Sequence, residues 1–305
     1  METQIVGGVA TAPPTPVSGG RAARLRQLAP FLPAGFILVG LFFVPLAVMF
    51  VFSLWSTNEN LDVVPVWSLE NYQNFFETPT YVRTLLKTSI IGAGVTITCL
   101  IAAGAVAYFL ARYVSRRWAR FALLVIIVPF WTSYLLRVYS WQAILGEKGA
   151  LNQVLMGLGL IREPSLLFVY NDVGTFIVLV YVYVPFAALV LYASLERFDF
   201  TQLTAAQDLG ARPIQAFRRI LLPQIRPGII TACIFVFIPI LGEFLTPSMV
   251  GGAQGLLIAN LVANFFKNAL IPEGAAVAFM IAAIVLLLLI IFRRYLRVED
   301  VVARA

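Results

Sequence analysis

The sequence contains no histidine and few charged side chains. Among its 305 residues histidine is absent and only 12% are Asp, Glu, Lys or Arg, whereas soluble domains average about 25% charged residues. Without histidine the chain lacks the commonest metal ligand and the usual general base near neutral pH. The sequence therefore predicts no metal site and no catalytic residue, and its low charge argues against a soluble protein.

Nucleotide-binding motifs and reactive cysteines are missing as well. The Walker A pattern GxxxxGK[ST], which cradles the phosphates of ATP, does not occur, and no loop is long enough to hold a catalytic domain. If transport is driven by ATP, a separate ATPase binds ATP and magnesium, and this chain has no cofactor. Cys99 and Cys233 fall within apolar runs, where cysteine acts as a small hydrophobic residue.

Long apolar runs account for the unusual composition. The chain is 60% hydrophobic and its mean hydropathy is +0.89, and a transmembrane helix needs about 20 consecutive apolar residues. Six runs of suitable length predict an all-α polytopic membrane protein with six transmembrane helices. The runs cover residues 31–55, 85–110, 119–136, 174–195, 229–250 and 275–292.

The distribution of lysine and arginine predicts the topology. The net charge of +7 would also suit a nucleic-acid-binding protein, but 16 of the 22 basic residues fall on one side of the predicted spans and 6 on the other. This asymmetry follows the positive-inside rule and places both termini in the cytoplasm. No nucleic-acid partner is predicted, and residues 1–29 and 296–305 are expected to be cytoplasmic tails, the first of them disordered.

Prolines recur inside the predicted spans, at Pro45, Pro129, Pro185 and Pro239. Each removes a backbone N–H and leaves a carbonyl without its helical partner. Two interpretations stand at this point: kinked helices around a transport pathway, or packing bends of the kind found in any helical bundle.

The predicted cytoplasmic loop 196–228 has a distinctive pattern. Within it, residues 203–223 read as two short helices, with Gly210 closing the first in a left-handed conformation, Pro213 in the first turn of the second, and Pro223 stopping it. Ile214, Phe217 and Leu221 share an apolar face of the second helix, and basic residues lie opposite. Such a helix docks on another protein or lies on anionic lipid.

The loop resembles a long family motif. Ala205 and Ala206, then Gly210, then Leu222 and Pro223, are similar to the "EAA" loop of permease subunits in bacterial ATP-binding-cassette (ABC) importers. The resemblance implies coupling helices that sit in a cleft of a cytoplasmic ATPase. Thr204 stands where the family usually has glutamate, which would weaken or retune docking only modestly, because an exposed ion pair contributes about 0–1 kcal/mol. The implied docking residues are Thr204, Ala205, Ala206, Asp208, Gly210, Phe217 and Pro223.

Other segments extend this resemblance. Residues 129–133 and 241–252 resemble permeases of spermidine/putrescine importers. The resemblance implies a type I ABC importer permease fold over 30–295 in a bacterial inner membrane. It also implies three protein partners: a second homologous permease, an ATPase dimer and a periplasmic solute-binding protein. The substrate would be a polyamine, or alternatively an opine or another small organic solute.

Other functional classes fit the sequence less well. An ion-coupled secondary transporter would also explain six spans and a buried carboxylate, but it has no use for this loop. A membrane-embedded enzyme is disfavoured because aspartate and glutamate are almost absent from the apolar runs.

A carboxylate within the predicted fifth span is the main candidate for substrate contact. Glu243 is costly to place in a membrane and would suit a cationic amine; the alternative is a structural pair with Arg137. An ammonium is attracted to aromatic ring faces by about 0.5–2 kcal/mol. The aromatic candidates are Trp131, Tyr134, Tyr181 and Tyr183, each of which can equally belong to the interfacial belt or to packing.

Two segments outside the spans are expected to form helices at the extracytoplasmic surface. They cover residues 68–76 and 149–161 and are partly amphipathic. Either would be available to a solute-binding protein.

Overall fold

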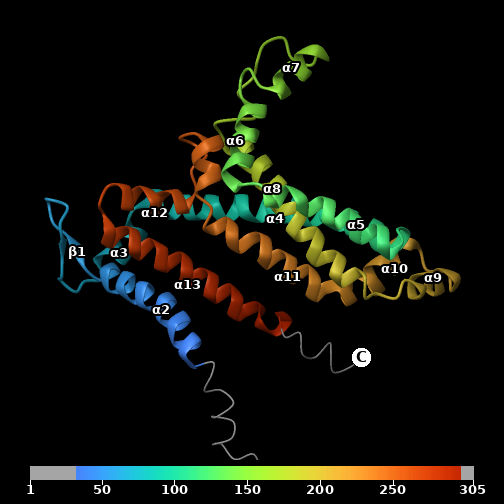
Figure 1. The fold of residues 1–305 in the computed structure, drawn as a ribbon, viewed down its shortest axis with the longest axis horizontal. Coiled ribbons are helices and arrows are strands. Elements are labelled where there is room, and N and C mark those ends of the chain that lie inside the picture. The colour runs from blue at the N-terminus through green and yellow to red at the C-terminus, as the bar shows by residue number, and fades with distance from the viewer. Residues whose placement is uncertain (1–31, 297–305) are drawn as a thin grey trace, which may run out of the picture. The chain divides into compact units, whose positions relative to one another are not determined.

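The computed structural model describes residues 32–296. The predicted tail 1–29 and residues 297–305 lie outside this range. The chain divides into two compact units, residues 1–49 and 50–305. Helix α2 (Leu32–Ser53) begins in the first unit and ends in the second. All longer elements of the second unit are helices (Figure 1), which confirms the all-α class.

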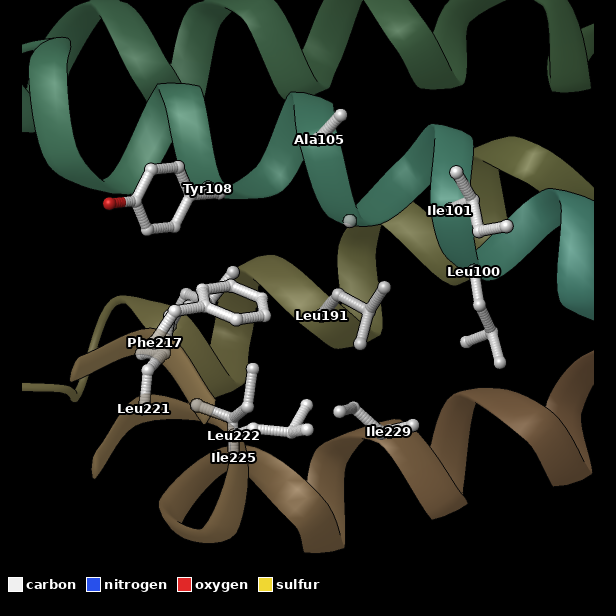
Figure 2. Close-up of a pocket in the computed structure, with 12 residues that line it drawn as sticks. Leu100, Ile101, Ala105, Tyr108, Leu191, Phe217, Leu221, Leu222, Ile225 and Ile229 are labelled. Atoms are coloured by element: carbon white, nitrogen blue, oxygen red, sulfur yellow. The ribbon is translucent and has the colours of Figure 1, made fainter. Parts of the chain in front are cut away.

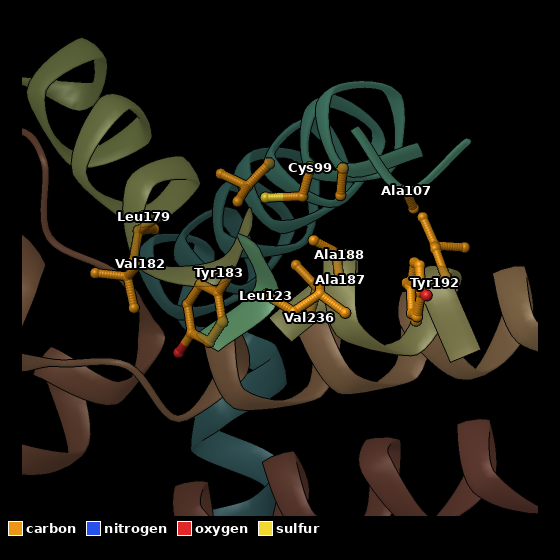
Figure 3. Packing of buried hydrophobic residues seen from close by; sticks show 14 of the residues in the cluster. Cys99, Ala107, Leu123, Leu179, Val182, Tyr183, Ala187, Ala188, Tyr192 and Val236 are labelled. Atoms are coloured by element: carbon orange, nitrogen blue, oxygen red, sulfur yellow. The ribbon is translucent and has the colours of Figure 1, made fainter. Parts of the chain in front are cut away.

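Three long helices form the centre of the second unit. They are α4 (Pro79–Tyr113), α8 (Asp172–Leu195) and α11 (Leu222–Leu241). Cys99, Ala103 and Ala107 recur every four residues of α4 and are fully buried, so one stripe of small side chains faces the neighbours. Figure 3 shows Cys99 on the side of α4 that faces Ala187 and Ala188 of α8. Small residues allow close approach of helix backbones in membrane proteins.

Further elements pack against these helices. A two-stranded antiparallel hairpin pairs β1 (Ser56–Thr57) with β2 (Val63–Val64). It is followed by α3 (Glu70–Glu77), and later in the chain α12 (Ile258–Lys267) and α13 (Ile271–Leu296) complete the unit. The Thr57 hydroxyl donates to Glu273 in the first turn of α13 at 3.1 Å. The helix expected within residues 68–76 corresponds to α3.

The predicted third span, 119–136, is not one straight helix. It divides into α5 (Arg116–Ile127), the 3-10 turn η2 (Val128–Trp131) and α6 (Tyr134–Leu145), and the chain bends by 90° between η2 and α6. Pro129 cannot donate a helical hydrogen bond, and Thr132 adopts an extended conformation. By contrast, Pro45, Pro185 and Pro239 lie inside continuous helices.

The predicted fifth span, 229–250, is shifted. A continuous helical segment runs from Pro213 to Leu241 and contains α10 (Pro213–Ala216), the π-helical turn η3 (Phe217–Leu221) and α11. Pro223 was expected to stop the second loop helix, but it lies in the first turn of α11, where its missing N–H is tolerated. The loop helix therefore continues directly into a membrane helix.

The number of spans follows from these elements. Four helices within residues 32–296 are long and apolar enough to cross a membrane, and the bent pair after Arg116 makes five. Helix α2 has 22 residues, which at about 1.5 Å per residue spans roughly 33 Å. Counting α2 is consistent with the six predicted spans, which stay a prediction.

Candidate functional site

The segment after α11 carries the charged residue of the site. Helix α11 ends at Leu241, and residues 242–257 pass through the π-helical turn η4 (Pro247–Gly251) before α12 begins. Hydrogen bonds from three other elements hold this segment. Gln142 of α6 donates to the carbonyl of Met249 at 2.9 Å, Tyr170 donates its N–H to Val250 at 2.6 Å, and Asn260 of α12 donates to Phe244 at 2.7 Å.

Glu243 lies at the start of this segment, partly buried, with both carboxylate oxygens occupied. Its Oε1 atom accepts the N–H groups of Leu245 at 2.9 Å and Thr246 at 3.1 Å, as a carboxylate does at the start of a helical turn. Its Oε2 atom accepts the Tyr134 hydroxyl at 2.6 Å. All of these donors are neutral, so they orient the carboxylate without compensating its charge.

Two of the four predicted aromatic residues meet Glu243. Tyr134 does so from the start of α6 through its hydrogen bond, and Tyr183 of α8 lies near enough to the carboxylate to interact with it electrostatically. Figure 3 shows the Tyr183 hydroxyl pointing away from the apolar cluster that holds its ring. Tyr181 packs instead against Trp141, with 5.1 Å between the ring centres, and Trp131 is 88% exposed.

Arg137 does not pair with Glu243. Within residues 32–296 the ion pairs are Lys87 with Asp172, and Arg116 and Arg120 with Glu196. The Arg137 guanidinium carbon lies 4.5 Å from the ring centre of Phe130 and 5.5 Å from that of Tyr134. Its Nε and Nη1 atoms are buried with no hydrogen-bond partner. The alternative of a structural pair is therefore not what this structure contains.

Two polar residues of the site were not predicted from the sequence. Thr246 is fully buried, and its hydroxyl lies 2.6 Å from that of Tyr134; because Tyr134 donates to Glu243, Thr246 donates to Tyr134. Asn260 is 4% exposed, and its Oδ1 atom accepts the N–H of Leu257 at 3.0 Å. The only local signal in the sequence was the position of Thr246, three residues after Glu243; no local signal pointed to Asn260.

The predicted docking loop forms a second candidate site at the opposite end of the long helices (Figure 1). Helix α9 (Thr201–Asp208) ends before Gly210, which has the left-handed φ of +90° that the sequence predicts. Of the predicted docking residues, Ala206 is partly buried and the others are exposed: Thr204, Ala205, Asp208, Gly210, Phe217 and Pro223.

Apolar side chains project from the loop. Leu209 is 90% exposed and Ile214 is 61% exposed, whereas Leu221 is fully buried. The predicted common face of Ile214, Phe217 and Leu221 is therefore divided. The π-helical turn at 217–221 provides the reason, because it adds one residue to the helical repeat and rotates the residues after it.

A cavity of about 460 Å³ lies directly behind the loop. Its walls come from α4, α8 and the start of α11, and Figure 2 shows Tyr108, Leu191 and Phe217 around it. Tyr108 supplies the only polar side chain of this lining, and Arg112 donates to its hydroxyl. Phe217 thus belongs both to the exposed loop and to the inner wall between the membrane helices.

Polar contacts hold the entrance to the loop. The Arg116 Nε atom lies 2.6 Å from Oε1 of Glu196, linking the start of α5 to the end of α8. Asp199 accepts hydrogen bonds from the N–H and hydroxyl of Thr201 at 3.0 and 2.7 Å. These bonds lower the pKa of the Asp199 carboxyl, because they favour its charged form.

Comparison with known proteins defines the family. Residues 101–300 match the family described as binding-protein-dependent transport system inner membrane component. The spermidine/putrescine transport system permease protein PotB of Escherichia coli K12 is 34% identical over 253 residues, which cover 83% of this chain and 91% of PotB. PotB of Haemophilus influenzae is 33% identical over 250 residues, which cover 82% and 86%. The chain belongs to this family and is a membrane permease subunit of an ABC importer.

Solved structures share the fold. A bacterial ABC transporter that imports the acidic polysaccharide alginate gives a TM-score of 0.68 at 16% identity, with 90% of this chain and 97% of that chain covered. The alginate transporter in complex with its alginate-bound periplasmic protein gives 0.69 at 15% identity, with 92% and 97% covered. At this identity the likeness concerns the fold, and it agrees with the type I importer permease expected from the sequence.

Proposed function

We propose that this chain lines half of the translocation pathway for a polyamine such as spermidine or putrescine. The observation that carries the proposal is Glu243, a carboxylate held by neutral donors from Tyr134, Leu245 and Thr246. A partly buried charge at membrane depth without a counter-charge is costly, and a passing ammonium group would compensate it. The rings of Tyr134 and Tyr183 would add cation–π attraction. The substrate named for PotB supports this choice.

The proposal includes three protein partners: a second homologous permease, a cytoplasmic ATPase dimer that binds ATP and magnesium, and a periplasmic binding protein. The loop around Gly210 would sit in a cleft of the ATPase, with both termini of this chain on the cytoplasmic side. Exposed Leu209 and Ile214 suit such a cleft. Pro213–Leu241 is one continuous helical segment. A displacement of the docked loop would therefore tilt α11 and shift Glu243, which follows the end of α11.

Uptake by the assembled transporter tests the substrate proposal. Glu243→Gln should lower spermidine uptake at least tenfold in proteoliposomes, while the complex still assembles and hydrolyses ATP. Glu163→Gln, an exposed glutamate in the loop before α8, is the matched control and should transport normally. Unchanged uptake by Glu243→Gln would remove the carboxylate from the pathway.

Arg137 favours one second candidate. Its buried nitrogens without partners would suit the anionic group of a substrate that also carries an amine. A relative 26% identical over 277 residues is named as a putative 2-aminoethylphosphonate transport system permease. Unlabelled compounds that compete with labelled spermidine for uptake separate the two candidates. Competition by polyamines alone favours the first, and competition by zwitterionic amines favours the second.

A further inference from the structure

The segment 138–171 leaves the helical bundle sideways. It contains most of α6, the helix α7 (Ala150–Gly157) and the loop before α8, and we call it the arm. Because the chain bends by 90° before α6, the arm runs across the direction of α5, α4 and α8 (Figure 1). If those helices cross the membrane, the arm extends parallel to the membrane plane.

The outward surface of the arm is apolar. Leu158 is 68% exposed and Leu160 is 67% exposed, and Val154, Leu166 and Leu167 are at least half exposed as well. The arm has four charged residues, and they fall in two short stretches, 146–149 and 161–164: Glu147, Lys148, Arg162 and Glu163. Two acids and two bases cancel, so an anionic partner would not be attracted by net charge.

The amide and hydroxyl side chains of the arm are hydrogen-bonded within the chain, both where they are buried and where, as at Ser140 and Gln153, they are exposed. Asn152 is fully buried and donates to the carbonyls of Gly146 and Ser165 while accepting the N–H of Ser165. Every serine, asparagine and glutamine of the arm likewise bonds to a backbone group. The others are Ser140, Gln142, Gln153, Ser165 and Asn171. Backbone groups at membrane depth need such internal partners, because lipid offers none.

We infer that the arm lies in the headgroup and acyl boundary of the bilayer, with Val154, Leu158 and Leu167 inserted among lipid chains. In the orientation proposed above, on which this placement rests, the leaflet is the outer one. Apolar side chains are also exposed on the elements before the arm, where Leu124 of α5 is 61% exposed and Val128 of η2 is 56% exposed. A soluble binding protein fits less well, since such interfaces use about one hydrogen bond per 100–200 Å².

A second permease chain also fits less well than lipid. Close helix contacts in membranes favour small residues, whereas branched aliphatic side chains dominate the outward surface of the arm. Interfacial helices bury their apolar face about 5–10 Å deep. The arm would then brace the end of α5 against the membrane while α11 moves.

Spin-label accessibility in the complete transporter, reconstituted in phosphatidylethanolamine/phosphatidylglycerol vesicles, tests this placement. Val154→Cys, Leu158→Cys and Leu167→Cys are labelled one at a time in a Cys99→Ala, Cys233→Ala background, with Glu163→Cys as the control. We expect oxygen, which partitions into lipid, to collide several-fold more often than a water-soluble nickel chelate at the first three positions. The ratio should reverse at position 163.

Two results would overturn the inference. Dominant nickel collisions at 154, 158 and 167 would place the arm in water, and low collision rates for both reagents would place it against a protein partner. Neither readout depends on the substrate, so failure of the polyamine proposal leaves this test intact. As a check on folding, labelled samples should retain ATP-driven transport.

Discussion

The Tyr134 hydroxyl donates a 2.6 Å hydrogen bond to Oε2 of Glu243, across 109 residues of sequence. This bond joins the start of α6 to the segment after α11. It joins the two places where the structure departs most from the predicted spans, which are the bend after Pro129 and the early end of the fifth span at Leu241. Movement of α11 would therefore change the environment of the carboxylate directly.

Tyr134→Phe should reduce uptake severalfold and destabilise the protein by about 1–3 kcal/mol, because the Glu243 carboxylate and the buried Thr246 hydroxyl both lose a partner. Uptake and thermal unfolding of the purified complex measure the two effects. Tyr139→Phe, an exposed tyrosine of the same helix, is the control. Equal behaviour of the two variants would contradict a role for this bond.

Gly210→Val should uncouple ATP hydrolysis from uptake or prevent ATPase assembly. The backbone at Gly210 has φ of +90°, and a β-branched residue there costs about 1–3 kcal/mol of local strain. Gly159→Val introduces comparable strain at φ of +71° in the arm and should leave the ATPase bound. Coupled hydrolysis that survives in Gly210→Val would show that the loop is not the docking site.

Gly228→Ala should destabilise the contact between α8 and α11. A Cβ atom added at Gly228 would lie 2.5 Å from the Cβ of Ser194, so the helices must separate, at a cost of about 1–3 kcal/mol. Unfolding temperature is the measurement, and adding Ser194→Gly should recover part of the loss. Gly157→Ala, with nothing within 4 Å of the new atom, should be neutral; the same drop in both would exclude a specific contact.

Asn152→Ala should loosen the arm. The change leaves the Ser165 N–H and two carbonyls without their partners, which costs about 1–3 kcal/mol for a buried group. Hydrogen exchange should rise across residues 158–170 and stay unchanged in α4. Gln153→Ala, which removes a single exposed bond to Lys148, serves as the comparison. Exchange that does not rise in Asn152→Ala would mean that other contacts hold the arm.

Several elements could be predicted because their signals are local. Hydropathy alone located α2, α4, α8 and α13 within a few residues, and the loop helices followed from Gly210 and Pro213. Two boundaries failed for a common reason. Residues 128–136 and 242–250 still contain large apolar side chains such as Phe130, Leu135, Phe244 and Leu245, so average hydropathy does not reveal that the helix breaks there.

The site was predictable only in part. Glu243 was evident because a carboxylate in an apolar run is rare, and Tyr134 and Tyr183 were among four aromatic candidates. Tyr183 is separated from Tyr181 by the face of α8 that meets the segment after α11, and Tyr134 is separated from Trp131 by the bend between η2 and α6. Arg137 also needed the structure, since its stacking on Phe130 and Tyr134 follows from the 90° bend.

The sequence by itself determined that this is a multi-helix membrane protein with two short loop helices around Gly210, because hydropathy and turn chemistry act over short distances, and its motifs indicated the permease family. Only the tertiary structure decided that the loop helix continues into α11, that Glu243 is bound by Tyr134 and not by Arg137, and that the arm turns across the bundle. These outcomes depend on contacts between residues far apart in the chain, where packing and hydrogen-bond satisfaction select among arrangements that local preferences leave equal.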